Sequence, residues 1–286
     1  AEDLRALIDS AKKNRLPSGM PVPIGQPRGE LSSLLSAALP KTRLSEMVLD
    51  EVTHSRLERI MSEQRNFEKI RAHGLSPRRK LLLVGPPGTG KSMTASALAG
   101  ELGIPLYIVR FDSLITKFMG ETAAKLRQIF DAIRDTRGIY FFDEFDAIGS
   151  QRSLQNDVGE IRRVLNSFLQ MIEQDQSNSL IIAATNHPEI LDYALFRRFD
   201  DVIEYGLPNQ EQIQTVLKNR LLNFSKSIRS WDKLCTTAEG LSYAELARAA
   251  DDAIKDAIIQ DRTEVAIKDV ERHLTERKAF HGRQRS

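Results

Sequence analysis

The amino-acid sequence predicts an α/β fold, with a parallel β-sheet core covered by helices and a small C-terminal all-α lid. Short apolar segments alternate with helical periodicity from Lys80 onwards, which is typical of a parallel sheet. A glycine-rich turn follows the first of these segments, and the strand patterns stop after Pro208. A chain of 286 residues is long enough for a large core and one small domain.

Composition narrows the function classes. Charged residues make up 28% of the chain and nearly cancel, leaving a net charge of +2, so the strong basic excess typical of nucleic-acid binding is missing. The single cysteine, Cys235, cannot form an internal disulfide. Neither a long apolar run nor a signal-peptide pattern is present. We therefore expect a cytoplasmic protein that does not cross a membrane.

The N-terminal segment, residues 1–44, is predicted to hold an amphipathic helix over 1–15 and a linker rich in proline and glycine over 16–29. Helices are expected over 31–39 and 43–72. The segment is too short for a substantial substrate-binding domain. It either docks a partner or a neighbouring subunit, or packs on its own module.

The core is expected over residues 45–208 and the lid over 209–286. Within the core, apolar Leu126, Ile129, Phe130 and Ile133 recur at helical spacing and mark one face packed on the sheet. The predicted strands are 81–84, 105–109, 139–142, 180–184 and 202–205, and the predicted core helices are 90–101, 121–134 and 158–173. The predicted lid helices are 211–222, 242–259 and 263–274.

A glycine-rich turn after the first strand fits the pattern G-x-x-x-x-G-K-[ST]. Gly85 and Gly90 allow the tight turn in which successive N–H groups point at phosphate oxygens. Lys91 supplies a charge for the β- and γ-phosphates, Ser92 offers a hydroxyl to Mg²⁺, and the following helix adds its positive dipole end. The sequence therefore predicts a P-loop nucleoside triphosphatase that binds ATP and Mg²⁺ through Gly85, Pro86, Pro87, Gly88, Thr89, Gly90, Lys91 and Ser92.

Polar residues follow two other predicted strands. Asp143 and Glu144 end the strand 139–142, and the carboxyl ends of parallel strands face the ligand crevice. We expect Asp143 to hold Mg²⁺ through its water shell and Glu144 to activate the attacking water. Asn186 ends the strand 180–184, and its amide would find partners at the γ-phosphate and the lytic water. A solvated acidic turn and a turn asparagine are the alternatives.

The adjacent pair Arg197 and Arg198 completes the set of candidate catalytic residues. Adjacent arginines are usually a solvated surface feature. The functional interpretation is an arginine offered to the γ-phosphate of a neighbouring subunit, which is worth about 10³ to 10⁵ in rate.

In this order the motifs resemble the AAA family of ATPases within the wider AAA+ class, over residues 45 to 275. The motifs are the loop at 85–92, Phe142-Asp143-Glu144, Thr185-Asn186, Arg197-Arg198-Phe199-Asp200 and the lid segment 240–246. The resemblance implies a ring, usually a hexamer, with ATP bound at subunit interfaces. It also implies that Asn186 is the first sensor and that Arg197 and Arg198 are arginine fingers acting on the neighbour.

Two details refine the resemblance. The finger arginines are adjacent, as in the katanin, spastin and fidgetin branch, rather than separated by Pro-Gly. The lid lacks an obvious sensor arginine at its helix start; the resemblance places Ala244 there, as a nucleotide-binding position where that branch has a small residue, so the absence is expected. We therefore expect a bacterial-type, single-module member of similar style.

The resemblance also gives a role to the loop formed by Lys117, Phe118, Met119 and Gly120, which is similar to the family's central-pore loop. An exposed Phe-Met pair could grip an extended polypeptide through non-directional apolar contact. Phe118 tucked into the core is the alternative. A second pore loop is expected within 150–159. Arg162 and Arg163 lie either at a subunit interface or on a solvated helix face.

The leading hypothesis is thus a homo-oligomeric, ATP-driven remodeller that unfolds or disassembles a protein substrate through a central pore. A nucleotide-dependent assembly switch that regulates a separately encoded effector, such as a protease, is the second. A nucleic-acid-remodelling ATPase is disfavoured by the near-neutral charge and the apolar pore loop.

Overall fold

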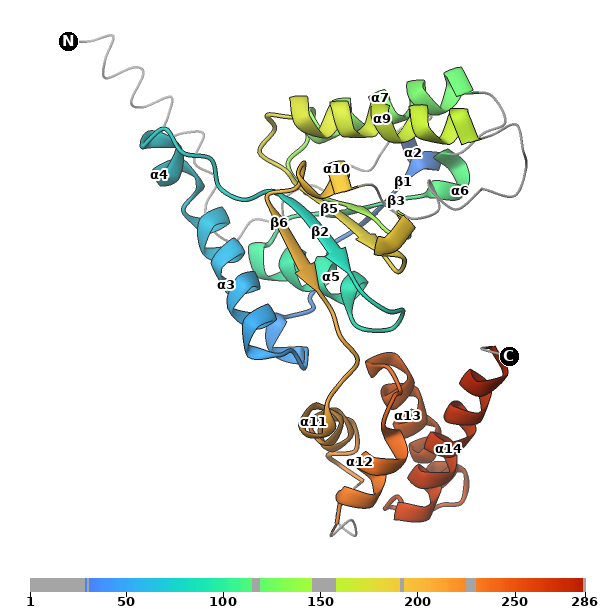
Figure 1. Ribbon diagram of the computed structural model, residues 1–286. Coiled ribbons are helices and arrows are strands. Elements are labelled where there is room, and N and C mark those ends of the chain that lie inside the picture. Colours follow the sequence, from blue (N-terminus) through green and yellow to red (C-terminus); the bar gives the residue numbers. More distant parts are fainter. Residues whose placement is uncertain are drawn as a thin grey trace, which may run out of the picture.

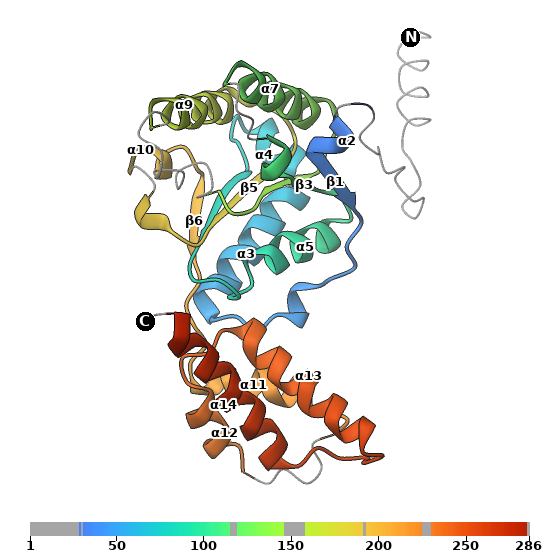
Figure 2. The same ribbon diagram turned by 90° about the vertical axis from the view of Figure 1, so that its right-hand side faces the viewer.

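The computed structural model describes residues 29, 31–114, 119–145, 158–190, 193–224 and 230–284. Figures 1 and 2 show a sheet covered by helices, with a separate helical lid below it, joined by the chain that leaves β6. None of the helices within these ranges is long and apolar enough to cross a membrane.

The sheet has six strands in the order β1-β3-β4-β5-β2-β6. All neighbouring pairs are parallel except β1 with β3, which is antiparallel. The strands are β1 (Leu35–Ala38), β2 (Lys80–Val84), β3 (Leu106–Val109), β4 (Ile139–Phe142), β5 (Leu180–Thr185) and β6 (Asp201–Glu204).

Both faces of the sheet are covered, which explains why the strands are apolar at successive positions. Because side chains alternate across a strand, Leu82 and Val84 pack into one core and Leu81 and Leu83 into the other. The long helices α7 (Met119–Asp135) and α9 (Val158–Gln174) cover the first face, with α2 (Leu31–Leu34), α6 (Phe111–Leu114) and α10 (Tyr193–Phe196). The second face is covered by α3 (Glu51–Arg65) and α5 (Lys91–Leu102). The short elements η1 (Leu44–Glu46), α4 (Phe67–Ala72) and η2 (Pro188–Ile190) complete this part.

The lid has its own apolar core, formed by residues from four helices and the segments between them. Capping boxes begin two of the helices: Asn209 pairs with Gln212 and Ser242 with Glu245, which satisfies N–H groups that the helix itself leaves without partners. The four helices are α11 (Gln210–Arg220), α12 (Asp232–Ala238), α13 (Tyr243–Ile259) and α14 (Ile267–Gln284).

The predicted helix over 31–39 is wrong. The chain is helical only at Leu31–Leu34 and then forms β1, whose residues pair with β3. Pairing with the edge of an existing sheet satisfies backbone groups that a short isolated helix leaves open, so tertiary context overrides the local pattern. The alternative that the N-terminal segment packs on its own module holds for these residues, whereas residues 1–28 lie outside the described ranges.

The predicted helix over 43–72 is divided. Met47 has extended backbone after η1, and the Asp50 side chain then caps α3 by accepting a 2.8 Å hydrogen bond from the Thr53 N–H. An aspartate favours the cap over the helix interior, so the long helix begins at Glu51. The other strands and long helices agree with prediction within a few residues, except that α14 begins at Ile267 and runs to Gln284. The helix α12 was not predicted.

Candidate functional site

Three neighbouring parallel strands bring the predicted motifs to one edge of the sheet. The strand β5 lies between β4 and β2, with Phe142 opposite Ala183 and Val84 opposite Thr185. The segments that follow these strands therefore emerge side by side at their carboxyl ends, the usual place for a ligand in such a sheet. The glycine-rich loop, the pair Asp143 and Glu144, and Asn186 all belong to these segments.

The loop between β2 and α5 takes a backbone course that requires glycine. Gly85 has φ of 145°, and a Cβ atom there would lie 2.2 Å from the carbonyl oxygen of Tyr205. Gly90 caps α5 in the left-handed conformation, with φ of 105°. The loop therefore turns closely enough to present backbone N–H groups to an anion at the start of α5.

Lys91 is buried at the centre of this loop. Its ammonium donates hydrogen bonds to the carbonyl oxygens of Gly85 at 2.7 Å and Pro86 at 2.8 Å. The Thr89 hydroxyl donates to the Pro86 carbonyl at 2.8 Å. These contacts hold the positive charge where the oxygens of a bound phosphate would compete for it.

Ser92 and Asp143 lie in direct contact although 51 positions separate them in the chain, since the Ser92 hydroxyl donates a 2.8 Å hydrogen bond to Asp143 Oδ2. A hydroxyl and a carboxylate are the hard oxygen donors that Mg²⁺ uses together with phosphate oxygens and water. These residues fit the ion: Ser92 and Asp143 would hold it, and when bound it neutralises negative charge that develops on the phosphates.

Glu144 is exposed beside this pair and has a left-handed backbone, with φ of 51°. Its N–H donates to Asp143 Oδ1 at 2.9 Å, and the next residue, Phe145, is buried and donates its N–H to the Ala184 carbonyl at 2.8 Å. A non-glycine residue adopts this conformation only when its surroundings hold it there. The Glu144 carboxylate is thus carried on a turn fixed at both sides, and the half-buried Asn186 follows the adjacent strand.

The lid touches the loop directly at Gly88. The N–H of Ala244, near the start of α13, donates a 3.1 Å hydrogen bond to the Gly88 carbonyl. A Cβ atom on Gly88 would lie 2.6 Å from the Ser242 hydroxyl and 3.1 Å from the Ala244 Cβ. Ala244, the lid residue that the resemblance places at the nucleotide, therefore lies against the glycine-rich loop of residues 85–92, here called the phosphate loop. Only small residues fit at this contact.

The two arginines lie apart from this group. Arg197 and Arg198 form an exposed turn between α10 and β6, and Arg198 pairs with Glu173 near the end of α9. The Asp200 N–H donates to the carbonyl of Lys80, the first residue of β2. The phosphate loop instead follows Val84, the last residue of β2. The arginines therefore stand at the end of β2 opposite to the phosphate loop of the same chain.

Part of the predicted pore loop lies outside the described residues, namely Lys117 and Phe118. Met119 and Gly120 form the first residues of α7. The expected second pore loop falls almost wholly outside the described ranges, and Arg162 and Arg163 are placed only as backbone positions of α9.

A buried pair of hydroxyl groups behind the loop was not predicted from the sequence. Thr94 Oγ1 and Tyr205 Oη lie 2.6 Å apart, and Thr94 also donates to the Gly90 carbonyl at 3.1 Å. Thr94 stands four residues after Gly90, a spacing that permits this bond in a helix. Nothing in the pattern around Tyr205 indicated its partner, because the two residues are 111 positions apart.

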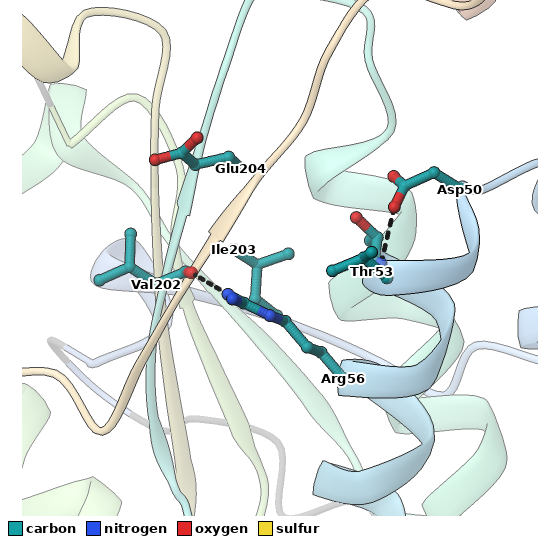
Figure 3. A pocket seen from close by; sticks show the side chains of 7 residues that line it. Asp50, Thr53, Arg56, Val202, Ile203 and Glu204 are labelled. Atoms are coloured by element: carbon teal, nitrogen blue, oxygen red, sulfur yellow. Dashed lines mark hydrogen bonds between the residues drawn. The ribbon is translucent and has the colours of Figure 1, made fainter.

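A cavity of about 350 Å³ lies between the start of α3 and β6 (Figure 3), lined by Asp50, Val52, Thr53, Arg56, Val202, Ile203 and Glu204. Arg56 reaches across it and donates a 2.8 Å hydrogen bond to the Val202 carbonyl, and it lies 3.5 Å from Asp201. Because β6 ends the sheet, this arginine satisfies a carbonyl that has no neighbouring strand. The contact protects the sheet edge.

Comparison with known proteins agrees with this geometry. The family model of the ATPase family associated with various cellular activities (AAA) matches residues 81–207. An uncharacterized AAA family ATPase, y4kL, from Sinorhizobium fredii is 39% identical over 237 residues, which cover 82% of this chain and 71% of that protein.

Relatives of lower identity carry names that refer to a protease or to the proteasome. The ATP-dependent zinc metalloprotease FtsH 4 of Sphaerobacter thermophilus is 33% identical over 76% of this chain, and the match covers 34% of that protein. A putative 26S proteasome regulatory subunit homolog of Methanothermobacter thermautotrophicus is 34% identical over 70% of this chain and is covered over 55% of its length. Together, the loop, its acidic partner and these similarities show that the chain belongs to the AAA family and is an ATPase.

Proposed function

We propose that this ATPase works as a homo-oligomeric ring, most simply a hexamer, that remodels a protein substrate. The observation that carries the proposal is the separation of Arg197 and Arg198 from the phosphate loop of their own chain. With a rise of about 3.3 Å per residue, the two ends of β2 lie about 13 Å apart, and the loop begins beyond the far end. Arginines so placed serve an ATP site on a second copy.

In this proposal each subunit binds ATP through its phosphate loop, with Lys91 on the phosphates. Glu144 accepts a proton from the attacking water, which Asn186 helps to orient. Arg197 and Arg198 of the neighbouring copy stabilise negative charge as the γ-phosphoryl group passes to water and its bond to ADP breaks. Ser92 and Asp143 bind Mg²⁺.

A protein substrate is supported by the relatives and by the sequence. Two relatives carry names that refer to a protease or to the proteasome. The segment with Phe118 and Met119 directly precedes and begins α7, where an apolar pair is suited to non-selective contact with an extended chain. Because its two finger arginines are adjacent, we also propose that the chain is similar to the katanin, spastin and fidgetin branch. A cytoplasmic location remains a prediction.

The assembly switch is the second candidate. It shares the ATP site and the ring but moves no polypeptide, so Phe118→Ala separates the two functions. We expect the variant to hydrolyse ATP at an unchanged rate and to lose processing of the substrate. Normal processing by this variant would favour the switch.

The substrate can be identified with a Glu144→Gln variant expressed in cells. This variant should bind ATP without hydrolysing it and retain its bound partners for mass spectrometry. The matched control is Glu144→Gln combined with Phe118→Ala, which should release the threaded protein but retain any partner held elsewhere. Equal recovery of every partner by both variants would contradict threading.

The N-terminal segment is proposed to recruit a partner through residues 1–28. The test is a variant that lacks residues 1–28. It keeps Leu35–Ala38, which form the strand β1 of the sheet. We expect loss of partner capture with unchanged basal ATPase activity. Unchanged capture would show that the segment has another role.

A further inference from the structure

Tyr205 is linked to both ends of the phosphate loop, directly at its start and through Thr94 at its end. At the start of the loop, its N–H donates to the Val84 carbonyl at 2.8 Å, and its carbonyl oxygen leaves no room for a side chain on Gly85. Towards the end of the loop, its hydroxyl lies 2.6 Å from the Thr94 hydroxyl, which in turn bonds to the Gly90 carbonyl. The path of this loop is therefore tied to one residue outside it, through both its backbone and its side chain.

Tyr205 is also the residue from which the lid connection leaves the sheet. Gly206, exposed Leu207, Pro208 and Asn209 follow it, and Asn209 caps the first lid helix. Figure 1 shows this single stretch of chain passing from β6 to the lid. Any change in the loop that moves Tyr205 therefore moves the base of this connection.

The contact between the two hydroxyls is compatible with either as the donor, and one direction links Tyr205 to the backbone of the loop. The Thr94 hydroxyl has a single proton, and when it donates to the Gly90 carbonyl its oxygen is left to accept the Tyr205 proton. Both residues are buried, and burial raises the pKa of Tyr205 above its ordinary value, so the phenol stays protonated as the donor. In this direction the hydrogen bonds run from Tyr205 through Thr94 to the backbone of the loop.

We propose that Tyr205 is a positioning residue for ATP hydrolysis, which transmits the state of the phosphate loop to the lid through its hydrogen bond with Thr94. When phosphates enter the loop and draw Lys91 from its carbonyl partners, the Gly90 end of the loop adjusts. Thr94 and Tyr205 carry that adjustment to the lid connection. Tyr205 would couple the phosphate loop to the lid rather than bind ATP, because the groups of the loop itself still hold the nucleotide.

Two substitutions remove the bond with little change in shape: Tyr205→Phe and Thr94→Val. We expect each to lower kcat by about ten- to a hundredfold, the effect of slight misplacement at a distance from the chemistry, and to leave KM for ATP unchanged. The double variant should be no slower than either single variant, because both remove the same bond. Thr94→Ser keeps the hydroxyl and should retain wild-type activity.

The matched control is Tyr140→Phe. Tyr140 is as deeply buried in the same sheet, but its hydroxyl donates to the Ala132 and Thr136 carbonyls, away from the loop. This substitution removes a buried phenol hydroxyl without touching the proposed coupling. We expect the kinetics of the parent protein.

Lid movement is measured separately by energy transfer between two dyes. Cysteines replace Leu75, which is 64% exposed in the large part, and Ile259, which is 79% exposed in the lid, on a chain with Cys235→Ala. ATP should change the transfer efficiency in the parent and in the Tyr140→Phe chain, and the change should be lost in Tyr205→Phe.

The outcomes are decisive for this inference. Reduced kcat with a lost lid response and restored activity in Thr94→Ser supports it. A Tyr205→Phe variant with parental kcat and lid response overturns it. So does a raised KM at unchanged kcat, which would make Tyr205 a nucleotide-binding residue, or additive losses in the double variant.

Discussion

At the scale of single residues, Gly88 is the point at which the phosphate loop and the lid meet. Its φ of 74° is a left-handed conformation that glycine adopts without strain, and a side chain there would lie too close to Ser242 and Ala244. The Ala244 N–H donates to its carbonyl, so the lid is both bonded to the loop and in steric contact with it. Access to the loop is therefore sensitive to a single methyl group at this position.

We predict that Gly88→Ala weakens ATP binding by displacing the lid. Gly74 offers a matched control because it has the same φ of 74°, and no atom lies within 4 Å of the position that an added methyl group would take. Both substitutions should lower the free energy of unfolding by about 1–2 kcal/mol through left-handed strain. Only Gly88→Ala should raise the dissociation constant for ATP in titration calorimetry. Equal affinities in the two variants would contradict a functional contact.

The residue types of the phosphate-binding motif were predictable because each carries its own chemical signal in a short, fixed spacing. Gly85, Lys91 and Asp143 belong to such patterns, and the structure brings them to one edge of the sheet. The Thr94–Tyr205 pair was not predictable, since neither residue type is informative alone. Their contact depends on the packing of α5 against the end of β6.

At the scale of elements, a buried ion pair holds the start of the strand β2. The Arg79 guanidinium binds both the carboxylate and the carbonyl of Asp175, and its side chain is 11% exposed and that of Asp175 4%. Asp200 accepts the backbone N–H groups of Arg79 and Lys80. These contacts fix where β2 begins, relative to β6 and the end of α9.

We predict that Arg79→Ala lowers the free energy of unfolding by about 3–5 kcal/mol, because Asp175 is left as a buried unpaired charge. The control is Arg134→Ala, which removes a pair with Asp131 whose side chains are 69% and 61% exposed. That loss should be about 0–1 kcal/mol. Urea denaturation measures both values. Similar losses in the two variants would show that burial does not determine how much an ion pair contributes to the free energy of unfolding.

The lid helices are joined by carboxylates whose pKa values are lowered. Hydrogen bonds from Lys255 and Arg277 lower the pKa of Asp252, and a hydrogen bond from His273 lowers that of Asp256. A carboxyl with a folded pKa below its unfolded value of about 3.9 stabilises the fold above that value. This stabilisation is lost as the pH falls through the folded pKa.

We therefore predict that the lid loses stability as the pH is lowered from about 5 to below 3.9. Trp231 is the single tryptophan of the chain and contributes to the lid core, so its fluorescence follows lid unfolding in urea. A chain with Asp252→Asn and Asp256→Asn should have a lower midpoint at neutral pH and a smaller further decrease in acid. The same acid dependence in both chains would contradict the assignment.

The periodic elements followed from the sequence, and the exceptions have physical causes. Buried parallel strands such as Leu180–Thr185 read as continuous apolar runs bounded by polar residues, so their positions were clear. The edge strand Leu35–Ala38 was predicted as helix because its four residues form a strand only through pairing with β3. The division at Asp50 depends on a cap that the apolar pattern concealed.

At the scale of the whole molecule, the phosphate loop and the arginine pair that the proposed mechanism combines lie at opposite ends of the sheet in one chain. The phosphate loop, Asp143 and Glu144 lie at the carboxyl ends of the central strands, with the lid against the loop (Figures 1 and 2). Arg197 and Arg198 precede β6 at the opposite end. In the proposed mechanism two copies bring these groups together, so hydrolysis requires assembly.

Mixing two inactive variants tests whether the site is shared between subunits. Lys91→Ala removes ATP binding but keeps the arginines, and Arg197→Ala with Arg198→Ala keeps ATP binding but removes the donated charge. Each variant alone should be inactive, and the mixture should recover ATPase activity, because a loop from one chain then meets arginines from the other. Co-assembly is checked by size-exclusion chromatography coupled to light scattering. A mixture that assembles but hydrolyses no ATP would contradict a site shared between subunits.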